Sequence, residues 1–206
     1  MKKRLKKSER HRQILENAAH VFATQGYEGA KTREIAEACE INEALLYRHF
    51  PSKLELFREV INSIHDDIAT LAKNVLSVES GGLPTLKKVI AALIKSIEDK
   101  PDYYANTLHS LAESIKDPEI HDLIFNRIKG HNAFLTRLIE QGIKEGTIRS
   151  DINPVEFSSL LLSLGYAFMI VESAGIKESL QPCEIRTLFD LILDIMIVPT
   201  DSSGTP

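Results

Sequence analysis

Proline and glycine divide this chain into stretches whose apolar residues recur at helical spacing, and no stretch alternates strictly enough to require a β-strand. Asp117-Pro118 and Asn153-Pro154 mark helix starts, and Gly81-Gly82 marks a break. The pattern predicts an all-α fold of about nine helices. We expect them at residues 8–25, from Thr32, from Asn42 to Pro51, at 52–78, at 84–99, from Pro101, at 118–145, at 154–174 and at 183–197.

The composition is that of an ordinary globular protein. With 206 residues and 43% hydrophobic side chains, the chain can bury a substantial core. Two distant cysteines, Cys39 and Cys183, in a chain without a signal peptide favour a reducing compartment, so we expect the cytoplasm. The longest apolar stretches, 157–171 and 185–198, are interrupted and fall short of the roughly 20 residues of a membrane-spanning helix. No membrane segment is predicted.

Charge is distributed unevenly along the chain. The net charge is −4, yet residues 1–60 hold 12 Lys and Arg against 9 Asp and Glu, which leaves 13 against 20 for the remainder. The first residues form a basic arm in which only Glu9 is acidic. Such an arm can bind a polyanion, and a solvated tail is an equally open explanation. The basic residues of the arm are Lys2, Lys3, Arg4, Lys6, Lys7, Arg10 and Arg12.

Two short helices joined by about four residues, Cys39 to Asn42, with a longer helix in front, form the pattern of a helix-turn-helix unit. If the second short helix buries Leu46 and Phe50, a step of about 100° per residue turns its other side chains outward or to the flanks. These side chains are Ala44, Leu45, Tyr47, Arg48 and His49. In a helix-turn-helix unit, this second helix is the one free to enter a major groove.

Local signals set the ends of these helices. Gly26 can supply a left-handed backbone at the end of the first helix. Thr32 and Asn42 are the expected N-caps of the two short helices, because their side-chain oxygens can accept from free backbone N–H groups. Ser52 and Glu55 form a capping box for the fourth helix.

Four segments carry a more specific pattern: TREIAEA at 32–38, Ile41-Asn42, LYRHF at 46–50 and SKLEL at 52–56. Their residue types and spacing resemble the N-terminal DNA-binding region of the TetR family of bacterial and archaeal transcriptional regulators. The resemblance covers roughly residues 8–57. The remainder carries no motif, and only its length and helix pattern agree with the regulatory domain of the family.

The resemblance implies a domain order and a function. A helix-turn-helix domain with its basic arm would occupy residues 1–50, a ligand-binding and dimerisation domain residues 51–198, and a disordered tail residues 199–206. The implied protein is a cytoplasmic homodimer that binds double-stranded DNA at a near-palindromic operator. It would act as a repressor that a small, mainly apolar ligand releases from DNA.

The resemblance also implies DNA contacts for matching residues. Bases would be read at the start of the recognition helix, and hydroxyl and cationic side chains would hold phosphates. The phosphate contacts are Thr32, Arg33, Tyr47, His49 and Lys53, the base contacts are Asn42, Glu43, Ala44 and Leu45, and the outward Arg48 joins them. The alternative for Tyr47 is a packed aromatic ring, and for His49 a surface histidine.

Three departures from the family pattern stand out. Glu40 occupies a turn position where the family usually has glycine, so a non-glycine residue would adopt a left-handed backbone at a cost of about 1 kcal/mol. Ala44 and Leu45 replace the commoner Gly and Thr. Glu43 either accepts from a cytosine amino group or only favours the positive end of the helix dipole.

The last two expected helices are apolar nearly all round, so they need cover on two sides. A four-helix dimer interface provides that cover, and burial within the monomer is the alternative. The expected interface residues are Leu161, Leu164, Gly165, Phe168, Leu188, Ile192 and Ile195. The middle helices offer aromatic and polar groups for a ligand, each of which can equally be a core or surface residue. These groups are Tyr103, Tyr104, His109, Phe125, His131 and Phe134.

Other classes of function have less support. The sequence contains no Walker loop, no Gly-x-Ser-x-Gly elbow, no His-Glu-x-x-His helix and no Cys-x-x-Cys pair, so we expect no enzyme activity and no cofactor. The pairs His65-Asp66 and His121-Asp122 are not metal signatures, because adjacent helical residues point in different directions, and we expect no metal. A helical enzyme and a membrane-touching binding protein are the competing hypotheses, and neither explains the pattern from Thr32 to Lys53.

Overall fold

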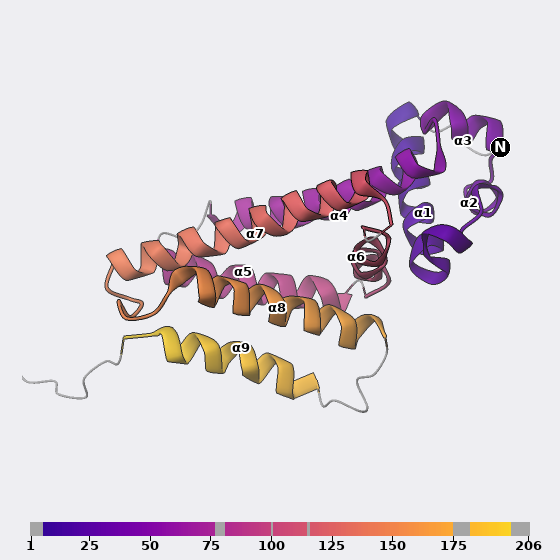
Figure 1. The fold of residues 1–206 in the computed structure, drawn as a ribbon. Helices are drawn as coiled ribbons and strands as arrows, with labels where there is room; N and C mark the ends of the chain where they lie inside the picture. Colours follow the sequence, from indigo (N-terminus) through magenta and orange to yellow (C-terminus); the bar gives the residue numbers. More distant parts are fainter. Residues whose placement is uncertain (1–5, 77–80, 100, 115, 175–181, 199–206) are drawn as a thin grey trace, which may run out of the picture. The chain divides into compact units, whose positions relative to one another are not determined.

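The computed structural model describes residues 6–76, 81–99, 101–114, 116–174 and 182–198. Within them the chain forms nine helices (Figure 1). They are α1 (Lys7–Gly29), α2 (Thr32–Ala38), α3 (Glu43–His49), α4 (Lys53–Leu76), α5 (Gly82–Asp99), α6 (Pro101–Ser114), α7 (Pro118–Lys144), α8 (Pro154–Ser173) and α9 (Pro182–Met196). The β-type pairing in these ranges is one isolated antiparallel bridge, Ile148 to Ile197. The predicted all-α fold of about nine helices is confirmed, and the expected tail 199–206 lies outside the described residues.

Contacts within the chain divide it into two compact units. Unit 1 comprises residues 1–70 and 97–125, and unit 2 comprises residues 71–96 and 126–206. The division therefore passes through α4, α5 and α7. The domain boundary expected near residue 50 separates short, basic-leaning helices from longer, acidic-leaning ones, and it stays a prediction.

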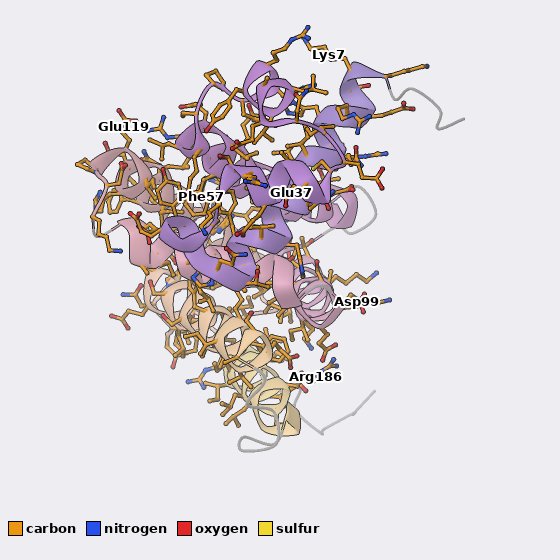
Figure 2. All side chains as sticks on the ribbon, turned by 90° about the vertical axis from the view of Figure 1, so that its right-hand side faces the viewer. Lys7, Glu37, Phe57, Asp99, Glu119 and Arg186 are labelled. Carbon is orange, nitrogen blue, oxygen red and sulfur yellow. The ribbon has the colours of Figure 1, made fainter. Side chains whose placement is uncertain are left out.

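The core of unit 1 forms around α1, which packs against α6 and α2. The α1 side chains of Ile14, Ala18 and Phe22 are fully buried, and the Phe22 ring meets the buried Phe57 ring of α4 edge-on with centroids 5.0 Å apart. Phe57 is labelled in Figure 2, as is Glu119 of α7, which forms an ion pair with Arg58 of α4. Burying aromatic side chains of this size stabilises the unit by about 2–3 kcal/mol each.

Two buried or half-buried polar side chains of α6 bind carbonyl oxygens of α1. Asn106 Nδ2 donates to Ala19 O at 2.8 Å, and His109 Nε2 lies 2.9 Å from Ala23 O. Since a carbonyl oxygen only accepts, His109 must carry its proton on Nε2. Gly26 follows with φ 70° and ψ 176°, a backbone that L side chains avoid, and it breaks the helical path before α1 ends at Gly29.

The ends of the short helices follow the local signals with one correction. Asn42 caps α3 as predicted, because its Oδ1 accepts from Leu45 N at 2.8 Å. The predicted N-cap at Thr32 is wrong: Lys31 is the N-cap of α2 and Thr32 is its first helical residue. The Thr32 hydroxyl is used elsewhere, as described below. Ser52 Oγ accepts from Glu55 N at 3.1 Å, which is one of the two bonds of the predicted capping box.

Unit 2 is held together by a close helix approach and by a polar network. A Cβ atom on Gly82 would lie 2.2 Å from the backbone N of Gly142, so glycine is required where α5 crosses α7. Gly82 N also donates to Glu145 Oε2 at 2.8 Å, and α5 begins there rather than at the expected Pro84. Between α7 and α8, the buried Ser158 donates to Asn132 Oδ1 at 2.8 Å.

Helix α8 is apolar on most of its circumference. It buries Leu161 and Phe168, yet Leu160 and Ile170 are each 48% exposed. By length and composition α8 could also cross a membrane: its most apolar window has a mean hydropathy of 1.6, and 33% of that window is buried. The same properties belong to a helix that packs on two sides.

Candidate DNA-binding surface

Two buried side chains fix α3 in unit 1. Leu46 and Phe50 are each 1% exposed, as the helical spacing predicts. The turn before α3 contains Glu40 with φ 54°, which confirms the left-handed non-glycine residue expected there. Ile41 N closes the turn by donating to Ala36 O at 3.0 Å. The remaining side chains of α3 are thereby directed to the flanks or away from the core.

Three of the predicted DNA contacts bind one another. The hydroxyl of Thr32 on α2 donates to Glu43 Oε1 of α3 at 2.7 Å, and the hydroxyl of Tyr47 lies 3.2 Å from Thr32 Oγ1. Thr32 and Glu43 are half-buried, while 45% of Tyr47 is exposed. Tyr47 is therefore not packed in the core, and Glu43 has a hydrogen-bond partner within the protein that the sequence did not indicate.

Arg48 and His49 are adjacent in the sequence, but they differ in exposure and in charge. Arg48 is exposed and makes no hydrogen bond or ion pair with the part of the chain that the structure describes. His49 is half-buried, and burial lowers its pKa, with a further lowering from its neighbours His11, Lys7, Arg10 and Arg48. His49 is thus neutral at pH 7, while the Arg48 guanidinium offers a full positive charge.

The other two predicted cations have partners in the structure. Arg33 Nε donates to Glu37 Oε1 at 2.8 Å, one turn along α2, and this bond raises the pKa of Arg33 (Glu37 is labelled in Figure 2). Lys53 Nζ donates to Glu28 O at 3.2 Å and lies 4.6 Å from the centre of the Tyr27 ring. The Tyr27 ring positions the ammonium group at the start of α4 through a cation–π contact.

The predicted base contacts sit at the start of α3. Ala44 is exposed, and Leu45 is half-buried. The Oδ1 of Asn42 accepts from Leu45 N, so its amide NH₂ group is what it can offer to a base. The surface near Ala44 and Leu45 is apolar and suits the methyl group of thymine.

Near the N-terminus, the described part of the basic arm is partly folded. Residues 1–5 lie outside the described residues, and α1 already begins at Lys7 (labelled in Figure 2). Arg10 Nη1 donates to Cys39 O at 3.3 Å, and the His11 ring stacks on Phe50 with centroids 4.6 Å apart. His11 Nε2 also lies 2.9 Å from Glu59 Oε2, a contact that the sequence does not indicate because no local pattern links residues 48 positions apart.

The predicted ligand contacts of unit 1 have different environments. Tyr104 is buried at 1% exposure, and His109 binds α1 as described above. Phe125 is 55% exposed and stacks on His121 with centroids 6.0 Å apart. The side chain of Tyr103 lies outside the described part of the structure.

The predicted ligand contacts of unit 2 lie on α7, where His131 and Phe134 are half-buried. Burial and the charge of Arg127 lower the pKa of His131, and burial lowers the pKa of Arg127 to about 10. Arg127 precedes His131 by one helical turn, and no motif in the sequence marks it. A separate groove of about 560 Å³ lies between α5 and α9 and contains neither His131 nor Phe134. It is lined by Lys87, Ile90, Ala91, Ile94, Arg186, Phe189, Asp190, Leu193 and Asp194.

The predicted dimer contacts separate into three groups by exposure. Leu161, Gly165 and Phe168 are buried within the chain, and Leu164 and Ile192 are half-buried. Leu188 and Ile195 are 44% and 47% exposed on α9. Leu191 was not predicted, and it is 54% exposed on the same helix. Among the described residues, no group of three or more His, Cys, Asp or Glu side chains is placed to hold a metal ion.

Comparison with known proteins identifies the N-terminal helices. Residues 14–60 match the bacterial regulatory proteins of the TetR family. The chain is 25% identical over 156 residues to the HTH-type transcriptional regulator UidR of Escherichia coli K12, covering 76% of this chain and 78% of UidR. It is 27% identical over 155 residues to the HTH-type transcriptional repressor KstR2 of Rhodococcus jostii, covering 71% and 72%.

The fold of the whole chain agrees with this match. The solved structure of the ketosteroid transcriptional regulator KstR2 of Mycobacterium tuberculosis superimposes with a TM-score of 0.72 and 19% identity, covering 94% of this chain and 98% of that one. These relatives are transcriptional regulators and not enzymes. Together with the helix-turn-helix geometry of α2 and α3, the match shows that this chain is a transcriptional regulator of the TetR family.

Proposed function

We propose that this protein is a cytoplasmic, homodimeric repressor that binds a near-palindromic DNA operator through α2, α3 and the start of α4. One observation carries the proposal: the hydroxyls of Thr32 on α2 and Tyr47 on α3 lie 3.2 Å apart in unit 1, while Leu46 and Phe50 anchor α3 from behind. Arg48 has a guanidinium that is not engaged by the described part of the chain, and Lys53 adds an ammonium group. Hydroxyl and cationic groups are the ones that hold DNA phosphates.

Base reading is assigned to Asn42, Ala44 and Leu45. The Asn42 amide can donate to a base edge, and the two apolar side chains allow close approach and contact with a thymine methyl group. Thr32, Arg33, Tyr47, Arg48, His49 and Lys53 are assigned to the DNA backbone. Glu43 belongs to the same surface, and its part is treated in the next subsection.

The dimer is assigned to the exposed apolar faces of α8 and α9. Leu160 and Ile170 on α8 and Leu188, Leu191 and Ile195 on α9 are each at least 44% exposed, which is unusual for large apolar side chains on neighbouring helices of one unit. A second copy covers such faces when two pairs of these helices form a four-helix interface. A dimer places two α3 helices about 34–36 Å apart on successive major-groove faces.

A small, mainly apolar effector is proposed to bind to the helices that follow the DNA-binding region and to release the protein from DNA. Within unit 2, the half-buried Phe134 supplies apolar contact area, and His131 supplies a neutral hydrogen-bonding group. Release requires that the effector bind the DNA-free conformation more tightly than the DNA-bound one.

A salt titration of DNA binding tests the function. The operator is first obtained by selecting duplexes from a random library with the purified protein. Affinity for the selected palindrome is then measured by fluorescence anisotropy between about 50 and 200 mM salt, where several phosphate contacts lower it by about 10³-fold or more. Equal, weak binding to the palindrome and to a scrambled duplex would contradict the proposal.

Leu45→Thr provides the matched test of base reading. The variant should prefer a different base pair at one position in each half-site while its salt dependence stays unchanged, because Leu45 is assigned to a base and not to a phosphate. Arg149→Ala in unit 2 is the control, since Arg149 already binds Asp151 and lies outside the proposed surface. An unchanged sequence preference in Leu45→Thr would refute the role of this residue.

A further inference from the structure

Thr32, Glu43 and Tyr47 form a hydrogen-bonded cluster in which two hydroxyl groups have one proton each. An ionised carboxylate only accepts, so the Thr32 hydroxyl donates its one proton to Glu43 Oε1 at 2.7 Å. The Thr32 oxygen can then only accept from the Tyr47 hydroxyl at 3.2 Å, which uses the proton of Tyr47 as well. Both hydroxyls therefore have their protons engaged within the protein.

A DNA phosphate also only accepts hydrogen bonds. It competes with Glu43 for the Thr32 proton and with the Thr32 oxygen for the Tyr47 proton, because neither hydroxyl has a second proton to offer. The Glu43 carboxylate carries a negative charge and oxygen acceptors, as a phosphate does, and it holds the position next to Thr32 that a phosphate would take. We propose that Glu43 is an intramolecular competitor of the DNA backbone, which must leave Thr32 before the Thr32 hydroxyl can donate to a phosphate.

This inference rests on the proposed DNA-binding function and gives Glu43 a role different from base reading. A base-reading carboxylate would bind a cytosine amino group and increase affinity for particular sequences. A competitor lowers affinity for every duplex by the same factor, because phosphates carry no sequence information. Glu43 thus sets how strongly the protein binds DNA in general, and the neighbouring Leu45 influences which sequence it prefers.

Glu43→Ala is the direct test, measured as affinity for the operator and for a scrambled duplex at one salt concentration. The variant should bind both about tenfold more tightly than the wild type, because the charge-assisted bond to Thr32 is no longer broken on binding. Glu43→Gln keeps an accepting oxygen without the charge, so its gain should be smaller. The melting temperature of each variant verifies that the fold is retained.

Two controls separate competition from simple charge removal. Glu34→Ala removes an equal charge from α2, where Glu34 binds Gln25 and not Thr32, and its gain measures the general electrostatic effect. In a background with Thr32→Val and Tyr47→Phe, which lacks both hydroxyls, Glu43→Ala should gain no more than Glu34→Ala does. In a background with Thr32→Ser, which keeps the hydroxyl, Glu43→Ala should still increase the DNA affinity.

The outcomes discriminate clearly. A gain in Glu43→Ala that exceeds the gain in Glu34→Ala and disappears without the hydroxyls supports competition. A loss of affinity, no change, a gain confined to one base pair, or an equal gain in the hydroxyl-free background would overturn it while leaving the proposed function intact. Absence of any salt-dependent DNA binding by the wild-type protein would refute the proposed function and this inference together.

Discussion

Helix α3 of unit 1 and helix α9 of unit 2 both expose side chains, but of opposite chemistry. On α3 the exposed side chains include the polar Tyr47 and Arg48, whereas α9 exposes Leu188, Leu191 and Ile195. A surface for phosphates depends on individual donors, because each proton serves one acceptor. A surface for a second subunit depends on the sum of its apolar area. Single substitutions should therefore affect the two helices in different ways, and four experiments test that difference.

The largest effect is expected from charging the α9 face. Leu191→Arg combined with Ile195→Arg places two cations where a second subunit would pack, and the burial of unpaired charges is very unfavourable. The variant should be a monomer by sedimentation, and its operator affinity should fall by about a hundredfold or more because one recognition helix is lost.

Phe125→Arg is the control for that variant. Phe125 is 55% exposed on α7, outside the two helices assigned to the dimer. It should leave the protein dimeric. A dimeric α9 variant, or a monomeric control, would contradict the assignment of the interface.

The second experiment removes the anchor of α3 rather than its exposed face. Phe50→Ala should lower the free energy of unfolding by about 3–4 kcal/mol, because it leaves a cavity where a fully buried ring stacked on His11. Urea unfolding followed by circular dichroism measures the loss. Tyr47→Phe, which changes an exposed ring, should alter stability by less than about 0.5 kcal/mol, and a larger loss would show that Tyr47 is structural.

The third experiment compares two arginines on the proposed DNA surface. Arg48→Ala should weaken binding to all duplexes about tenfold and lower the slope of log affinity against log salt by about 2 per dimer, since each cation releases about 0.9 counterions. Arg33→Ala should have a smaller effect, because Arg33 already binds Glu37. Equal effects of the two substitutions would mean that the hydrogen bond between Arg33 and Glu37 breaks on DNA binding without a cost in free energy.

The smallest effect concerns pH and stability. Burial keeps the pKa of His131 below the ordinary value of 6.5, so below pH 6.5 the unfolded chain takes up a proton that the folded chain resists. The stability contribution is therefore complete above pH 6.5 and is lost as the pH falls towards the pKa of the folded state. Urea unfolding between pH 7.5 and about 5.5 should show a weaker pH dependence in His131→Gln.

The exposed His121 provides a matched control for that measurement. His121→Gln removes an exposed histidine beside Phe125, so it measures the effect of replacing a surface histidine by glutamine. The smaller burial of His49 predicts a smaller change for His49→Gln than for His131→Gln. An equal change in all three variants would show that burial does not set the protonation of His131.

Local signals sufficed to predict most helix ends from the sequence. Asn42 and Asn153 cap their helices, and Asp117 Oδ1 accepts from Glu119 N at 2.8 Å, because a short polar side chain next to a helix start has few other uses. Thr32 was one exception, and the start of α5 at Gly82 instead of Pro84 was another. The Thr32 hydroxyl could either cap α2 or bind a residue of α3, and only the packing of the two helices decides between these bonds.

Long-range contacts carried no signal in the sequence. Asn106 binds a carbonyl 87 positions away in the chain, and nothing in its local context distinguishes it from a surface asparagine. The apolar pattern of α8 was equally ambiguous, since it has no polar face. The structure buries Leu161 and exposes Leu160, so it separates the side chains packed within the chain from those that remain exposed.

The isolated bridge between Ile148 and Ile197 has a consequence for local unfolding. Arg149 N donates to Met196 O at 2.9 Å, and Val198 N donates to Thr147 O at 3.4 Å. These bonds join the C-terminal end of α9 to the segment that follows α7. Helix ends normally fray with little free-energy cost, and this one must first break two backbone hydrogen bonds. Amide hydrogens of Arg149 and Val198 should exchange slowly with solvent, and the exposed Leu191 and Ile195 side chains keep a fixed spacing.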